Sequence, residues 1–236
     1  MTGNAVSHAN LNEQVRAHAP QLMQAAIQAY QGGRRVEAAA ICRRIVEVLP
    51  DNFDVLHLLG VAELDCGNIA EAEQALQRAV RVNPQSAEAC SNLGSALFQL
   101  DRFEEARKFQ ERALTLQPNF PTALTNLGNT LMRLSLYQHA IQAHDVALRL
   151  APDYSDAHVN RGMALIMLER HEEADRSFDR ALALRPGHFQ ALAGKGMVGI
   201  NLRHFDAALA HFDAALAINP NAAEVLAHRG HLTRIP

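Results

Sequence analysis

Residues 121–154, PTALTNLGNTLMRLSLYQHAIQAHDVALRLAPDY, are one copy of a 34-residue pattern that recurs along most of the chain. Proline marks the period most clearly, and glycine and alanine keep the same interval at other positions. So regular a spacing indicates a tandem array of one structural unit. The residues that recur are Pro50, Pro84, Pro118, Pro152, Pro186 and Pro220; Gly60, Gly94, Gly128, Gly162, Gly196 and Gly230; Ala38, Ala72, Ala106, Ala140, Ala174 and Ala208; and Ala79, Ala113, Ala147, Ala181 and Ala215.

Each repeat has the features of two antiparallel helices joined by a short turn. Proline cannot continue a helical hydrogen-bond ladder, so the six prolines separate the second helix of one repeat from the first helix of the next. The alanines stand where two helix axes must approach closely, and apolar residues between them follow helical spacing. Gly33 and Gly67 mark the turn inside a repeat, where a positive φ is useful. We therefore predict an all-α fold.

The period places a repeat domain at residues 19–236 and leaves residues 1–18 as a disordered N-terminus or a short capping helix. One more first helix is expected at 223–235, after the last complete repeat. The predicted repeats are 19–52, 53–86, 87–120, 121–154, 155–188 and 189–222. Positions within a repeat are counted below from these first residues.

Composition narrows the classes of function. The 236 residues include 22 Lys and Arg against 25 Asp and Glu, and the basic residues form no stripe, so nucleic acid is not expected as a partner. No apolar run approaches the roughly 18 residues of a membrane span, and the first residues have no leader pattern. Cys42, Cys66 and Cys90 fit neither a disulfide framework nor a metal-binding spacing. We expect a cytoplasmic protein without a membrane partner.

No motif of catalysis stands out. His228 and His231 share a helix face, but no carboxylate at a matching offset completes a metal site. Gly194-Lys195-Gly196 lacks the earlier glycine and the following Ser or Thr of a phosphate-binding loop. We therefore expect no catalytic residue, no metal and no cofactor, and the protein is not expected to be an enzyme.

The repeat resembles the tetratricopeptide repeat (TPR) family over residues 19–235. That likeness is carried in residues 121–154 by Leu124, Asn126-Leu127-Gly128, Leu131, Tyr137, Ala140, Ala147 and Pro152. The resemblance implies an α-solenoid, a right-handed superhelix of stacked helix pairs. It also implies that first helices line a concave groove, which is usually a surface for binding peptides or proteins.

Three consecutive repeats carry asparagine at position 6 of the first helix, namely Asn92, Asn126 and Asn160. An amide side chain offers two donors and an acceptor, so it can hold a peptide unit whatever side chain that unit carries. First helices about 10 Å apart match about three residues of an extended chain. This series is similar to the asparagines in the repeat region of O-GlcNAc transferases. The alternative is that these amides only bond neighbouring backbone.

The remaining candidate contacts occupy positions 9, 12 and 13, where apolar and flexible side chains gather in the later repeats. Methionine adapts to irregular apolar surfaces, which suits either a binding groove or a core. Gly194 stands where the next asparagine would be, so we predict a notch there beside Met163, Met167 and Met197. The candidate peptide-binding residues are Asn92, Asn126, Asn160, Asn129, Phe98, Met132, Met163, Met167, Met197 and Gly194.

Three functions remain open at this point. In the first, the chain is a protein-interaction module whose concave groove takes an extended peptide or a partner protein. Alternatively, it is the substrate-recruiting region of a larger glycosyltransferase similar to O-GlcNAc transferase. The third possibility is a self-assembling scaffold that forms homo-oligomers through the terminal helix 223–235, which has no predicted partner helix.

Overall fold

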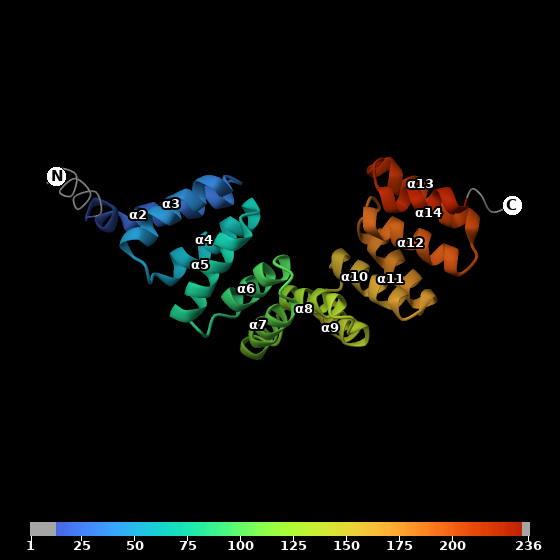
Figure 1. Ribbon diagram of the computed structural model, residues 1–236, viewed down its shortest axis with the longest axis horizontal. Helices are drawn as coiled ribbons and strands as arrows, with labels where there is room; N and C mark the ends of the chain where they lie inside the picture. The colour runs from blue at the N-terminus through green and yellow to red at the C-terminus, as the bar shows by residue number, and fades with distance from the viewer. Residues whose placement is uncertain (1–12, 233–236) are drawn as a thin grey trace. The chain divides into compact units, whose positions relative to one another are not determined.

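The computed structural model describes residues 13–232, and all regular secondary structure in that part of the chain is helical (Figure 1). The all-α prediction is confirmed. The chain divides into two compact units, the first ending at Pro118 and the second beginning at Asn119. None of the helices in residues 13–232 is both long and apolar enough to cross a membrane.

The first unit stacks three helix pairs. The first helices α2, α4 and α6 contact one another in succession, and α3 and α5 each pack against the helices before and after them. Residues 13–17 are helical before α2, with Val15 buried, whereas residues 1–12 lie outside the described part. The helices are α2 (Ala19–Gln31), α3 (Arg35–Val48), α4 (Phe53–Cys66), α5 (Ile69–Val82), α6 (Ala87–Gln99) and α7 (Phe103–Leu116).

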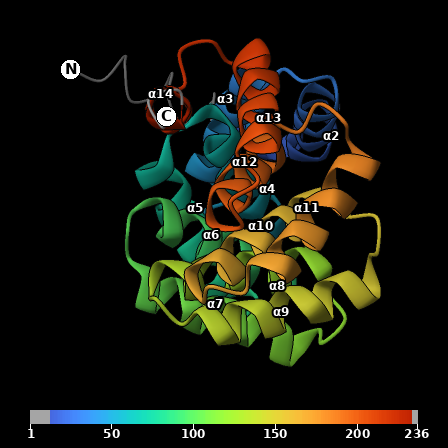
Figure 2. The ribbon, with the colours of Figure 1, turned by 90° about the vertical axis from the view of Figure 1, so that its right-hand side faces the viewer.

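The second unit repeats this arrangement. Its helix pairs follow in chain order (Figure 2). Helix α10 contacts both α8 and α12, and α14 packs on α13. The expected terminal helix is present as far as Leu232, and its last three predicted residues lie outside the described part. The helices are α8 (Pro121–Arg133), α9 (Tyr137–Leu150), α10 (Ser155–Met167), α11 (His171–Leu184), α12 (Phe189–Asn201), α13 (Phe205–Ile218) and α14 (Ala223–Leu232).

The periodic residues explain where helices end. Each periodic proline lies two residues after the last residue of a second helix, as at Val48 and Pro50, which is where proline stops a helix. In each of the six complete repeats, a residue with positive φ follows the first helix within two residues; it is glycine in the first two repeats and a larger residue afterwards. These residues are Gly33, Gly67, Asp101, Ser135, Glu169 and Arg203.

The periodic alanines and glycines let the helices of a repeat pack closely. All the alanines of both series have no exposed surface. In five repeats the glycine at position 8 lies against the side chain at position 24 of the second helix, so that a Cβ on the glycine would overlap it. These pairs are Gly60 and Leu76, Gly94 and Gln110, Gly128 and His144, Gly162 and Phe178, and Gly196 and Phe212.

Two of these position 24 residues are polar and fully buried. The side-chain nitrogen and oxygen of Gln110 and both ring nitrogens of His144 have no hydrogen-bond partner among the described residues. Leaving such groups unpaired in a protein interior is unfavourable by about 1–3 kcal/mol. Burial accordingly lowers the pKa of His144 to about 4, so the ring is neutral at pH 7.

Candidate functional site

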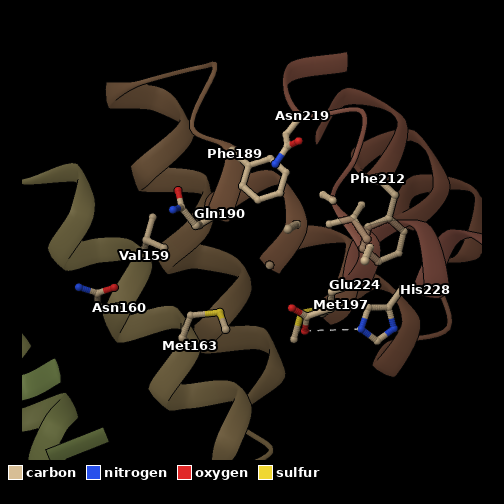
Figure 3. Close-up of a pocket in the computed structure, with 15 residues that line it drawn as sticks. Val159, Asn160, Met163, Phe189, Gln190, Met197, Phe212, Asn219, Glu224 and His228 are labelled. Atoms are coloured by element: carbon tan, nitrogen blue, oxygen red, sulfur yellow. Dashed lines mark ion pairs between the residues drawn. The ribbon is translucent and has the colours of Figure 1, made fainter. Parts of the chain in front are cut away.

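A hollow of about 330 Å³ opens in the second unit, between the first helices α10, α12 and α14 (Figure 3). Side chains from these helices, from the middle of α13 and from the turn that follows α13 surround the cavity. The residues that line it are Val159, Asn160, Met163, Phe189, Gln190, Ala193, Gly194, Met197, Phe212, Asn219, Ala222, Ala223, Glu224, Val225 and His228.

The walls of this hollow are mostly apolar. Met163 and Met197 occupy position 9 of neighbouring first helices and are both half-buried. Phe212 is fully buried, and Val225 is 4% exposed. A cavity lined by flexible thioethers and buried apolar groups suits an apolar side chain of a ligand.

Polar groups stand around the apolar walls. The amides of Asn160, Gln190 and Asn219 line the cavity, with donors and acceptors suited to a peptide backbone. The Glu224 carboxylate is 82% exposed and lies 4.0 Å from the His228 ring nitrogen Nε2. The His228 ring stacks on Phe212 with a centroid distance of 5.9 Å. The hollow therefore has an apolar interior and an edge that carries amides and one acidic group.

The notch predicted at Gly194 needs a correction. The absent side chain does not leave empty space, because the Phe178 ring of the preceding repeat fills the place where a Cβ of residue 194 would stand. The hollow lies beside this point, where Gly194, Met163 and Met197 line it. Met167 is not among its lining residues, and 51% of its surface is exposed.

The candidate asparagines have different surroundings. The Asn92 amide nitrogen Nδ2 lies 2.9 Å from His57 Nε2, on the first helix of the preceding repeat. Burial lowers the pKa of His57, which favours the neutral ring that can accept this bond. Asn126 is half-buried on α8, and Asn160 lines the hollow. The role of Asn92, Asn126 and Asn160 in holding a ligand stays a prediction.

The other candidate residues lie away from the hollow. Phe98 on α6 makes an edge-to-face contact with Phe103 on α7, with ring centroids 5.5 Å apart. Asn129 and Met132 are half-buried on α8, where Met132 packs against the core of the second unit. The structure thus brings together Asn160, Met163, Gly194 and Met197 from the predicted set.

Sequence reasoning missed the lining residues that lie outside the expected first-helix positions. Phe212 stands at position 24 of the repeat, in a second helix, and Asn219 and Ala222 come from the turn between repeats. Phe189 and Val225 lie in the first turns of first helices. The signal that could have found them was the period itself, because they occupy fixed positions of the repeat, namely 1, 3, 24, 31 and 34.

A sequence profile described as tetratricopeptide repeat matches residues 57–123, 125–175 and 160–223. The chain belongs to the tetratricopeptide repeat family. A comparison with curated protein sequences gives no significant match. Within residues 13–232 of this TPR protein, no three His, Cys, Asp or Glu side chains are grouped so that they could hold a metal ion.

Solved structures share this TPR fold at low sequence identity. The Cut9-Hcn1 hetero-tetramer of the APC/C matches 94% of this chain with a TM-score of 0.82 and 19% identity, and the match covers 45% of that longer chain. The pilF protein of Pseudomonas aeruginosa matches 93% of this chain and 99% of its own, with a TM-score of 0.76 and 18% identity. YrrB, described as a TPR protein with an unusual peptide-binding site, matches 80% of this chain and 97% of its own, with a TM-score of 0.63 and 20% identity. At these identities the likeness shows the fold.

Proposed function

We propose that this chain is a protein-interaction module that binds an extended polypeptide and holds one apolar side chain of it in the hollow between α10, α12 and α14. The observation that carries the proposal is the open cavity itself, with Met163 and Met197 on its walls and Asn160 and Gln190 beside them. TPR proteins generally mediate protein–protein interaction, and the hollow supports a role of this kind for this chain. The module needs no catalytic group.

Three cysteines that do not pair with one another fit a cytoplasmic location, which we include in the proposal. Cys42, Cys66 and Cys90 are all free thiols, and Cys42 and Cys90 are buried. Burial raises the pKa of the Cys42 thiol to about 12, which keeps that sulfur protonated and poorly reactive.

The interpretation as the recruiting region of a glycosyltransferase rests on the three asparagines. Asn160 lines a cavity and Asn92 is hydrogen-bonded to His57. Neither arrangement is specific to a glycosyltransferase, because any peptide-binding repeat protein could use it. No described feature favours that function, so we do not propose it.

Peptide binding can be tested with two methionines of one helix. Peptides would first be selected from a random 12-residue library displayed on phage, and their affinity measured by fluorescence anisotropy. Met163→Glu puts a charge into the apolar hollow, so we expect at least a tenfold loss of affinity, about 1.4 kcal/mol. Met167→Glu is the matched control, because Met167 is exposed and does not line the hollow.

The control should bind within about twofold of the original protein, a difference well below 1 kcal/mol. Equal losses in both variants would place binding elsewhere on α10. Full affinity of Met163→Glu, with an unchanged circular dichroism spectrum, would exclude the hollow as the site.

Self-association is a second candidate, favoured by exposed apolar side chains on the last two helices. Leu226 on α14 is 46% exposed and Ile218 at the end of α13 is 49% exposed. If these groups form a contact between copies, sedimentation should show dimers at high protein concentration, and Leu226→Glu should restore the monomer. A monomer at every concentration would exclude this contact.

A further inference from the structure

A second hollow, of about 310 Å³, lies in the first unit between α2 and the start of α4. Met23 of α2, Ile45 of α3 and Val55 of α4 supply apolar walls, and Ile45 and Val55 are almost fully buried. Asp54 stands at its edge and is exposed. None of these residues belongs to the candidate site described above.

The two hollows occupy equivalent places in the repeat. Met23, Asp54 and Val55 line the first hollow, and the residues five periods later, Ala193, Glu224 and Val225, line the second. The equivalence has a structural cause, because each hollow lies where a second helix has ended and the next first helix begins. Leu49, the C-cap of α3, and Asn219, the C-cap of α13, line the two hollows from this turn.

One small side chain, that of Ala19, borders the first hollow. Position 1 of α4 holds Phe53, which stacks on His57 with ring centroids 5.6 Å apart. Position 1 of α2 holds Ala19, which lines the hollow and has no side chain large enough to fill it.

Charge indicates the chemistry of the occupant. Asp54 and Glu224 are acidic residues at the same position of the two hollows. Arg16 also borders the first hollow, but its guanidinium donates to the Val48 carbonyl at 3.0 Å. Val48 is the last residue of α3, so the negative end of that helix offsets the arginine charge. An apolar side chain beside a basic residue would complement both hollows.

We propose that the hollow between α2 and α4 is a second binding site, and that it takes a leucine-sized side chain of an extended peptide with a lysine or arginine next to it. This proposal rests on the proposed function of the hollow in the second unit. It adds that the chain has two binding sites for such a segment, one in each unit.

The methionine methyl groups can report on each hollow separately. The probe is the blocked peptide acetyl-Ser-Gly-Leu-Lys-Gly-Ser-amide. A single short motif is expected to bind with a dissociation constant of about 1 mM, so the peptide is titrated to several times that concentration. In spectra of protein labelled with ¹³C at the methionine methyl groups, we expect saturable shifts of Met23 as well as Met163 and Met197. Met167, which lines neither hollow, should not move. A peptide with alanine for leucine should move none of them.

Two variants assign the shift to the first hollow. Ala19→Leu should fill the hollow and weaken binding there at least tenfold, as read from the Met23 shift, while the shifts of Met163 and Met197 stay the same. The matched control is Ala25→Leu, at an exposed position of α2 outside the hollow. Asp54→Lys, at an exposed site that leaves the core intact, should reverse the preference so that the peptide with glutamate for lysine shifts Met23 more.

The outcomes separate the two proposals. Shifts of Met163 and Met197 without a shift of Met23 would overturn the second site and leave the proposed function standing. Shifts of neither group would overturn both. A Met23 shift that is equal for the lysine and glutamate peptides would overturn the assignment of a basic segment.

Discussion

Replacing Phe178 by alanine is expected to destabilise the second unit by about 3–5 kcal/mol, the usual range for a buried phenylalanine. Phe178 is fully buried in the largest apolar cluster of that unit. Its ring lies against glycines of two successive first helices, Gly162 and Gly194. Because neither glycine has a side chain that can move into the space, the cavity would stay open. Urea unfolding followed by circular dichroism measures the loss.

Phe205→Ala is the matched control, because Phe205 starts the next second helix and is 38% exposed. It should lower stability by less than about 1 kcal/mol. A second test uses Gly194→Ala, which overpacks the site while the ring is present and should be tolerated in the Phe178→Ala background. Equal stability of Phe178→Ala and Phe205→Ala would contradict this packing. So would additive effects of Gly194→Ala and Phe178→Ala in the double variant.

Replacing His144 by phenylalanine is expected to stabilise the protein by about 1–3 kcal/mol at pH 7, since it removes buried nitrogens that lack partners. The equivalent residues Phe178 and Phe212 show that the site next to a position 8 glycine accommodates a phenyl ring. Gly128 provides the same space beside residue 144. The free energy of unfolding at pH 7 measures the gain.

The gain should grow as the pH falls. Burial lowers the pKa of His144 to about 4, while Asp145 raises it and Arg161 lowers it to smaller extents. The histidine of the unfolded chain takes up its proton near pH 6.5. Between these values the unfolded state binds more protons, so native stability falls as pH decreases from about 6.5 to 4, by about 3 kcal/mol at most. His144→Phe should lose this part of the pH dependence.

The matched control is His139→Phe, because His139 lies on the exposed side of α9, the helix that also carries His144. That variant should keep the acid sensitivity of the original protein. If His144→Phe and the original protein lose stability in parallel between pH 6.5 and pH 4, the conclusion that His144 is buried in its neutral form is wrong.

The repeat period predicted the helices because its marker residues act locally. Pro152 ends a helix by its own chemistry, and Ala140 reports the close approach of two helices through its small size. The partners that fill the core are less visible, since they come from other repeats. Gly194 looked like an empty place in the sequence, but the ring that occupies it belongs to Phe178, in the preceding repeat.

The candidate site was predictable to the extent that it follows first-helix positions. Met163 and Met197 share position 9, and their meeting in one hollow follows from stacking of neighbouring repeats. Phe212 and Asn219 were missed because they reach the hollow from a second helix and a turn. The contact between Asn92 and His57 joins two repeats, and the identity of its partner depends on side-chain geometry that the period does not specify.

The most direct test of peptide binding in the second-unit hollow is photo-crosslinking. A library-selected peptide would carry photo-leucine in place of its apolar anchor residue, and mass spectrometry would locate the crosslinks. We predict crosslinks to Met163, Met197 or Phe212, which are lost when excess unlabelled peptide competes. Crosslinks confined to exposed faces of the second helices α11 and α13, or no peptide selected at all, would contradict the proposed function.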